Sequence, residues 1–456
     1  MSPGETQRAS VQGRLEPYPA YRDSGVEWLG QIPEHWETPA LKRLVDPTRP
    51  ITYGIVQCGP DHPDGIPYVR PVDMHDERGV KVDDLQKTTP EIAAAYARST
   101  IRPGDVVVSI GPSFGKAMIV PPELNGANLT QGTARVAPAP RVASPFLFWA
   151  LRAESSRQAW DSYCSGATFR ALTLETLGSC AVALPPLIEQ RAIADFLDRE
   201  TARIDALVAK KERLIELLQE KRTALISRAV TKGLDPNVPM KDSGVEWLGE
   251  IPAHWHLRNL KHVCERVFVG IAEAATFAYV DDGVPMLRST DVRANRIRTN
   301  DIRQIDRRFA DRLRSKRLRT GDIVTVRTGN AGVSAVVPLE FNQGQCFTLV
   351  VSRLSVVNDS RYFCYWLNAP VGQLQFVVEG MGTAQVNISV PIVQNTTVCV
   401  PPPDEQAQIA SWIERQLVRW DALTLRTREA IDRLKELRAA LISAAVTGKI
   451  DVREEA

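Results

Sequence analysis

The chain has no long hydrophobic run: none of its segments approaches the roughly eighteen apolar residues that a membrane-spanning helix needs. Residues 1–14 are polar and lack the apolar centre of a signal peptide, so we expect a cytoplasmic protein that makes no contact with a membrane. Cysteine is sparse, and none of the seven falls in a Cys-x-x-Cys pair, which predicts reduced thiols rather than a disulfide framework or a zinc site. The motifs of serine hydrolases, zinc proteases and dinucleotide-binding enzymes are also missing, so the residues predict no catalytic site and no metal site.

An excess of charge of one sign is lacking as well, because the net charge is only +2. The positive charge is nevertheless unevenly distributed. Between Val284 and Thr328 thirteen Arg and Lys residues stand against five Asp residues, whereas the equivalent stretch of the first half is not comparably basic. Such an arginine-rich stretch favours contact with a phosphate backbone. A solvated helical face would have a similar composition and remains an alternative.

The most informative feature of the sequence is a repeat. Residues 23–36, DSGVEWLGQIPEHW, return as residues 242–255, DSGVEWLGEIPAHW, with two differences in fourteen positions. Further matches follow at spacings that shrink from 219 to 216 positions, such as Gly104-Asp105 with Gly321-Asp322. The chain is therefore a tandem duplication of a unit of roughly 215 residues, far longer than the repeats of a solenoid. Two similar bodies imply two similar functions.

Each repeat is predicted to begin with an α/β (α+β) body and to end in a long helix. Short β-branched runs at 106–110 and 323–326 follow Gly-Asp turns, and residues 146–151 and 362–367 are typical of buried helix starts, which favours a mixed or mostly antiparallel sheet. After Pro185-Pro186 and Pro401-Pro402, apolar residues recur at heptad spacing over four or five heptads, which predicts a coiled-coil helix. The expected packing positions are Leu197, Ile204, Leu207, Leu214, Leu218 and Leu225 in the first helix and Ile413, Trp420, Leu423, Leu434, Leu437 and Leu441 in the second.

Helices of about 45 residues cannot bury such apolar rows alone. Because the chain must travel out to the second body and return, we expect the two helices to pair antiparallel as a rigid rod; the alternative is that each folds onto its own body. The predicted organisation is an N-terminal extension (1–22), a first body (23–184), a first spacer helix (185–233), a second body with its opening motif (234–399), a second spacer helix (400–449) and a tail (450–456).

The duplicated opening motif, the Gly-Asp strand with its glycine loop, and the Pro-Pro-x-x-Glu-Gln segments at 185–190 and 401–406 together resemble the specificity subunit of Type I restriction-modification systems. Residues 382–389, GTAQVNIS, are similar to a Gly-Ser-Thr-Gln-x-Asn-Ile-Ser pattern of that family, and the resemblance covers about residues 18–451. It implies two target recognition domains that read a bipartite, asymmetric site in double-stranded DNA. It also implies spacer helices that dock two modification (methyltransferase) subunits, with restriction (translocase-nuclease) subunits as further partners. This chain would bind no cofactor, and S-adenosylmethionine, ATP and Mg²⁺ would be used by the partners.

The expected DNA-contacting residues follow from the basic stretch and from this resemblance. Those in the second body are Arg288, Arg296, Arg298, Arg327, Gln385 and Asn387, and those in the first are Arg70, Lys116 and Arg170. The first body has GATFRAL at 166–172 where the second has its Gln and Asn, so it departs from the family pattern there. For His35 and His254 we expect a packing or capping role rather than catalysis. Two other functions stay open: a standalone DNA-binding regulator, and a scaffold that reads no bases.

Overall fold

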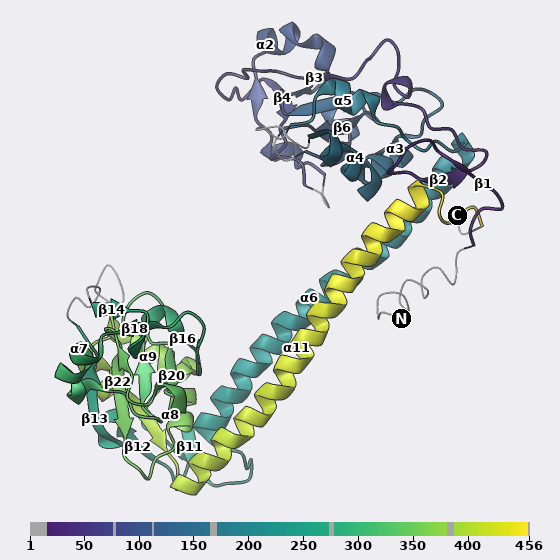
Figure 1. Cartoon of the computed structure of the whole chain (residues 1–456). Helices are drawn as coiled ribbons and strands as arrows, with labels where there is room; N and C mark the ends of the chain where they lie inside the picture. Colours follow the sequence, from purple (N-terminus) through teal and green to yellow (C-terminus); the bar gives the residue numbers. More distant parts are fainter. Residues whose placement is uncertain are drawn as a thin grey trace. The chain divides into compact units, whose positions relative to one another are not determined.

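The computed structural model describes residues 16–75, 79–111, 114–164, 171–272, 278–380 and 387–454. The chain divides into two compact units (Figure 1): unit 1 comprises Met1–Lys211 and Glu429–Ala456, and unit 2 comprises Glu212–Arg428. Each unit contains one α/β body and a part of both long helices, which confirms the predicted fold class. Within the described residues no helix is long and apolar enough to span a membrane, and no cluster of His, Cys, Asp and Glu could hold a metal ion.

The body of unit 1 contains two sheets. An antiparallel sheet has the order β3 (Thr52–Tyr53), β9 (Thr133–Val136), β6 (Val106–Ser109), β7 (Ala117–Ile119), and a mixed sheet has the order β5 (Lys87–Thr88), β4 (Ile66–Val69), β8 (Asn128–Leu129). The opening motif pairs β1 (Tyr21–Asp23) with β2 (Gln31–Pro33). The helices are α2 (Pro90–Ala95), α3 (Ser144–Arg152), α4 (Glu154–Cys164) and α5 (Leu174–Ser179), and the 3-10 turns are η1 (Leu41–Arg43), η2 (Val82–Asp84), η3 (Ala97–Ser99) and η4 (Pro122–Leu124).

The body of unit 2 repeats this plan. Its antiparallel sheet has the order β13 (Cys264–Val269), β22 (Val350–Leu354), β19 (Ile323–Thr325), β20 (Ser334–Val336), and its mixed sheet has the order β14 (Tyr279–Val280), β18 (Arg303–Ile305), β15 (Val284–Leu287), β21 (Gln345–Cys346). Three strand pairs join β10 (Met240–Asp242) to β11 (Glu250–Pro252), β12 (His256–Asn259) to β23 (Thr397–Val400), and β16 (Val292–Arg293) to β17 (Arg296–Ile297). The helices and 3-10 turns are η5 (Leu260–His262), η7 (Ser289–Asp291), α7 (Arg307–Arg312), η8 (Arg314–Lys316), η9 (Leu339–Phe341), α8 (Ser360–Asn368), α9 (Pro370–Gly380) and α10 (Val390–Asn395).

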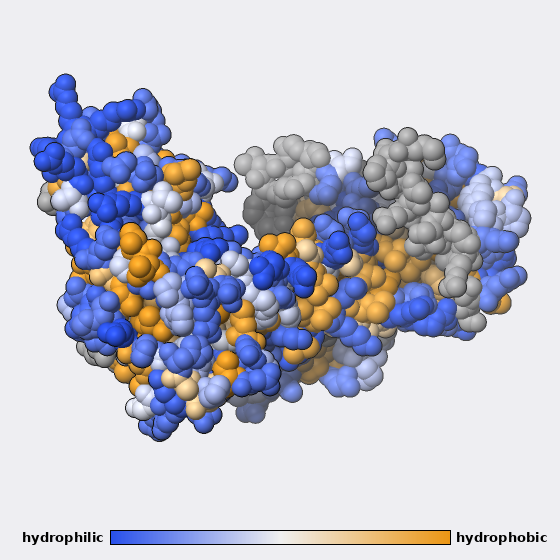
Figure 2. All heavy atoms as spheres, turned by 90° about the horizontal axis from the view of Figure 1, so that it is seen from below, coloured by the Kyte–Doolittle hydropathy of each residue, from blue (hydrophilic) through white to orange (hydrophobic). Residues whose placement is uncertain are grey.

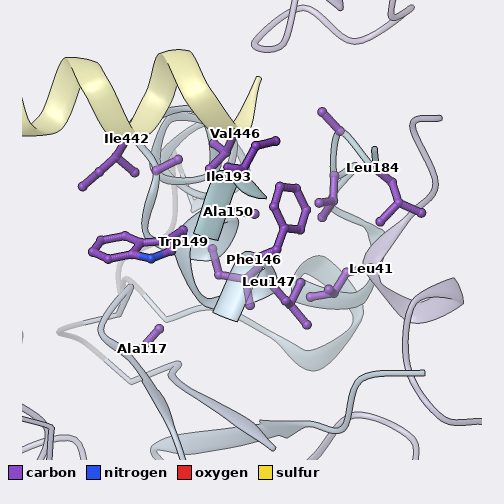
Figure 3. Close-up of a cluster of buried hydrophobic side chains, with 14 of the residues drawn as sticks. Leu41, Ala117, Phe146, Leu147, Trp149, Ala150, Leu184, Ile193, Ile442 and Val446 are labelled. Atoms are coloured by element: carbon purple, nitrogen blue, oxygen red, sulfur yellow. The ribbon is translucent and has the colours of Figure 1, made fainter. Parts of the chain in front are cut away.

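The core of unit 1 is shared between its body and the ends of both long helices. Figure 3 shows Phe146 and Ala150 of α3 close to Ile193 of α6 (Leu187–Lys232) and Val446 of α11 (Pro403–Val446). All four side chains belong to one buried cluster. Because a large apolar side chain stabilises the fold by about 1.5–3 kcal/mol when fully buried, this shared core fixes the helix ends to the body.

Within each unit the two long helices are antiparallel, as predicted. In unit 1 Arg438 pairs with Asp205 at 2.9 Å, while Val446, further along α11, shares a core with Ile193, earlier in α6. Unit 2 shows the same opposed order in the 2.8 Å ion pair between Arg222 and Asp421 and in the shared core of Val230 and Ile409.

The twelve expected packing residues of these helices differ in burial. Buried residues are Leu197, Ile204, Leu218, Ile413 and Leu441; half-buried are Leu225, Trp420, Leu434 and Leu437; exposed by 41–45% are Leu207, Leu214 and Leu423. Thr427 and Ile431 are also buried, and Thr427 lies on the same seven-residue row as Ile413 and Leu441. The exposed residues Leu207, Leu214 and Leu423 belong to the second row of their helices, three positions later, so burial falls mainly on the first row.

Candidate nucleic-acid interface

A glutamate at the start of α6 joins this helix to the opening motif of unit 1. The indole Nε1 of Trp36 donates to Glu189 Oε2 at 3.0 Å, and His35 Nε2 lies 2.8 Å from Glu189 Oε1. The hydroxyl of Tyr18 donates to Glu189 Oε2 at 3.3 Å. The predicted structural role of His35 therefore has a physical basis, because its ring is bound to a helix carboxylate.

Unit 2 has the same arrangement at the start of α11. Trp255 Nε1 donates to Glu405 Oε2 at 3.1 Å, and His254 Nε2 lies 2.8 Å from the same oxygen. The next residue, Gln406, accepts from the backbone N–H of Asp359 at 3.0 Å and donates to the carbonyl of Pro401 at 2.9 Å. The repeated Glu-Gln pair therefore orients each helix on its body.

Each unit also holds the end of the other long helix. In unit 1 the hydroxyl of Tyr21 donates to the carbonyl of Gly448 at 3.0 Å, and Lys449 Nζ donates to the carbonyl of Leu29 at 3.3 Å. In unit 2 Tyr362 donates to the carbonyl of Val230 at 2.9 Å. The body of each unit is thus fixed to both helices, which gives its surface side chains a rigid support.

Two of the expected DNA contacts, Arg70 and Arg288, lie in equivalent turns and are each paired with an aspartate. Arg70 bonds Asp73 through Nε at 2.9 Å and Nη2 at 2.7 Å, and Arg288 bonds Asp291 through Nε at 3.0 Å and Nη2 at 2.9 Å. The hydrogen bond to the aspartate raises the pKa of both guanidinium groups. These pairs close the turn after β4 and after β15, so less of each guanidinium is free for a phosphate.

Arg327 and Asn387 are two of the expected DNA contacts. They come from distant parts of the sequence, and their side chains lie in contact in unit 2. Arg327 Nη2 donates to Asn387 Oδ1 at 3.4 Å, and its Nε donates to the carbonyl of Ile388 at 3.1 Å. In unit 1 the Nζ of Lys116 donates to the carbonyls of Pro71 and Met74 at 3.1 and 3.0 Å. Two further expected contacts, Arg170 and Gln385, lie outside the described residues.

Unit 2 carries a set of exposed arginines whose side chains make no hydrogen bond or ion pair with the residues that the structure describes: Arg296, Arg298, Arg303, Arg308 and Arg314. We call this set the arginine patch. Of its members only Arg308 lies on an α-helix, α7; Arg296 is on β17 and Arg303 is on β18. A solvated α-helical face therefore does not account for the other members of the arginine patch.

Unit 1 also has an arginine-lined site, which the sequence analysis missed. A cavity of about 580 Å³ is lined by Arg49, Arg98, Arg102 and Arg135. Arg49 and Arg135 are distant in the sequence from each other and from Arg98 and Arg102, so a local count of charge does not reveal the site, and the fold brings these residues together.

The comparisons with known proteins point to one family. Residues 60–217 match the family model of the Type I restriction modification DNA specificity domain. The chain is 27% identical over 229 residues to the EcoBI specificity subunit of Escherichia coli, covering 50% of this chain and 44% of that protein. It is 23% identical over 445 residues to the putative MjaX specificity subunit of Methanocaldococcus jannaschii, covering 93% and 96% of the two chains.

The chain is similar over most of its length to specificity subunits of Type I restriction enzymes, and the family model of their DNA specificity domain matches it at residues 60–217. Two solved structures share the fold of this chain. The HsdS subunit from Thermoanaerobacter tengcongensis has a TM-score of 0.56 at 19% identity, covering 92% of this chain and 98% of that one. A chain from a study of assembly and conformational transition in a type I R-M system has a TM-score of 0.71 at 17% identity, covering 92% and 99%.

Proposed function

We propose that this chain is a specificity subunit that reads a bipartite, asymmetric DNA site, with one part of the site contacted by each unit. The two bodies share a strand order and a Glu-Gln attachment to the helices, yet differ in the arginines that they expose. A common scaffold with different surface side chains suits two readers of two different short sequences.

The observation that carries the proposal is the arginine patch of unit 2. Guanidinium groups bind phosphate and the guanine edge in a bidentate manner, and an arginine without a protein partner loses no existing bond when it does so. Arg327, which contacts Asn387, provides a second polar site in the same unit; asparagine is suited to pair with adenine.

The long helices are proposed to dock the modification subunits, and through that complex the restriction subunits. Large apolar side chains remain exposed on both helices: Leu207, Leu214 and Leu217 on α6, and Val418, Leu423 and Leu425 on α11. On the face drawn in Figure 2, hydrophobic patches are visible between hydrophilic residues. Exposed apolar groups of this kind mark protein interfaces. The modification subunits would supply S-adenosylmethionine chemistry, and this chain itself would remain non-catalytic.

Methylation in cells tests the function directly. We would express the chain with a Type I modification subunit in a host without other Type I systems, and map adenine methylation across the genome. The expected result is one methylated motif made of two specified parts around an unspecified spacer. Methylation of a continuous motif, or the same methylation without this chain, would refute the proposal.

The arginine patch is tested separately by the salt dependence of DNA binding to the purified full chain. Each phosphate contact contributes about 0.9 to the slope of log affinity against log salt, so Arg296→Ala with Arg298→Ala should lower the slope by up to about 1.8. The matched control is Arg258→Ala, an exposed arginine on β12 outside the patch. An unchanged slope in the double variant would place the DNA contact elsewhere.

A further inference from the structure

The cavity of unit 1 combines an excess of positive charge with an aromatic wall. Besides its four arginines it is lined by Tyr53, with the guanidinium carbon of Arg98 at 6.0 Å from the ring centroid. Asp105 bonds both terminal nitrogens of Arg49 at 2.8 and 2.6 Å. The carboxylates that act on Arg135 are this Asp105 and the partly exposed Asp46.

Arg135 is the buried member of this set, and it has no carboxylate of its own. It is 4% exposed, and its terminal nitrogens donate to the carbonyls of Arg98, Thr100 and Pro50 at 2.6, 2.9 and 3.1 Å. Its Nε has no hydrogen-bond partner among the described residues. Burial, followed by repulsion from Arg49, lowers the pKa of Arg135. Burying a positive charge costs free energy unless an anion balances it. An anion in the cavity would therefore stabilise the Arg135 side chain.

The corresponding place in unit 2 is apolar. In unit 1, Arg135 of β9 lies opposite Thr52 on one side and Val107 on the other. In unit 2 the same position of the sheet is taken by Val351 of β22, which lies opposite Phe268 and Val324. The fold therefore does not need an arginine at this position, because the duplicated sheet closes with an ordinary hydrophobic contact.

We propose that the cavity lined by Arg49, Arg98, Arg102 and Arg135 is a binding site for a phosphate group. Arginine forks match the geometry of phosphate oxygens, and a cavity of this volume has the size of a small-ligand pocket. Two sources carry that group: a free nucleotide, whose ring would find Tyr53 on the wall, and the DNA backbone. If the ligand is the DNA backbone, the inference rests on the proposed function. If the ligand is a free nucleotide, it does not.

The test uses calorimetric titration of the full chain with AMP, inorganic phosphate and adenosine. We expect AMP and phosphate to bind at one site and adenosine not to bind. Arg102→Ala removes an exposed lining arginine and should weaken binding at least about tenfold, because a hydrogen bond to a charged group contributes about 1.5–3 kcal/mol. Arg135→Val installs the residue type found at the equivalent position of unit 2 and should abolish binding. Arg191→Ala, an exposed arginine on α6 outside the cavity, is the matched control and should bind as the wild type does.

A short DNA duplex distinguishes the sources. A duplex that displaces AMP from the wild type identifies the DNA backbone as the ligand. AMP binding that a duplex leaves unchanged identifies a small phosphorylated molecule. Loss of about 0.9 from the salt slope in Arg102→Ala supports the backbone even without AMP binding. The proposal is overturned if AMP and phosphate do not bind and both cavity variants keep the wild-type salt slope, or if AMP binds equally to all the variants. Methylation of a two-part motif would be unaffected by that outcome, so the two proposals fail separately.

Discussion

Replacing Glu189 by alanine should detach the start of α6 from the body of unit 1. The carboxylate accepts hydrogen bonds from Trp36 and Tyr18 and contacts His35, and the Trp36 indole is only 1% exposed. A hydrogen bond to a charged group contributes about 1.5–3 kcal/mol, and an unpaired buried N–H costs about 1–3 kcal/mol. We therefore expect a loss of about 3–4 kcal/mol of local stability in Glu189→Ala. Glu405→Ala should cost less, about 2 kcal/mol, because the Glu405 side chain is 27% exposed against 11% for Glu189.

Hydrogen exchange read by mass spectrometry is the suitable assay, because a chain of two units does not unfold in a single two-state step. Exchange should accelerate at the first turns of α6 in Glu189→Ala and at the first turns of α11 in Glu405→Ala, each without a change at the other site. Glu200→Ala is the control: its carboxylate lies further along α6 and makes surface ion pairs worth about 0–1 kcal/mol. If Glu189→Ala exchanges no faster than Glu200→Ala, the glutamate does not attach the helix and the reasoning is wrong.

Other substitutions test the helices and the tight contacts at their ends. Leu197→Ala should cost about 2–5 kcal/mol in exchange-derived stability, whereas Leu207→Ala, at an exposed position, should cost less than about 1 kcal/mol. Leu207→Asp should leave the fold intact and weaken binding of the modification subunit in a pull-down; undiminished binding would exclude Leu207 from the interface. Gly448→Ala should destabilise unit 1 more than Gly25→Ala. Both glycines have positive φ, which costs about 1–2 kcal/mol for alanine, but only at Gly448 would the new Cβ lie 2.3 Å from Pro33 Cδ. Equal effects on thermal unfolding would contradict this.

The repeat made most of the fold predictable, because the sequence signals of the main helices and strands occur once in each half of the chain. Proline pairs before heptad rows gave both long helices, and Gly-Asp turns before β-branched runs gave β6 and β19. The exact packing residues were less predictable, because heptad spacing marks two apolar rows and does not show which row faces the partner helix. Leu207 is exposed, whereas Ile204, three positions earlier, is buried.

The DNA-contacting residues stay a prediction. Arg296 and Arg298 are exposed, as a surface role requires. The pairing of Arg70 with Asp73 had a local signal, since Arg-x-x-Asp occurs in both repeats. A count of charged residues does not show that such an arginine is already paired with an aspartate. The cavity of unit 1 had no local signal, because Arg49 and Arg135 approach each other only through the pairing of β3 with β9.

The two units solve one structural problem with different arginines, and that difference explains how a duplicated scaffold gains a new site. In both units the aspartate of the Gly-Asp turn accepts from a backbone N–H three residues earlier, that of Arg102 or Arg319. The carboxylate of Asp322 is paired with the guanidinium of Arg353, whereas the carboxylate of Asp105 is paired with the guanidinium of Arg49. Because Asp105 pairs with Arg49 in unit 1, Arg135 is left, among the described residues, with backbone carbonyls as its acceptors and an unpartnered Nε, and no carboxylate balances its charge directly. Divergence after duplication has thus kept the charge balance of the turn while leaving a buried cation beside a cavity. In Arg49→Ala we expect Arg135 to pair with Asp105 instead, so that its charge no longer binds phosphate and phosphate binding to the cavity is lost. Retention of full phosphate binding would show that Arg49 and Arg135 act independently.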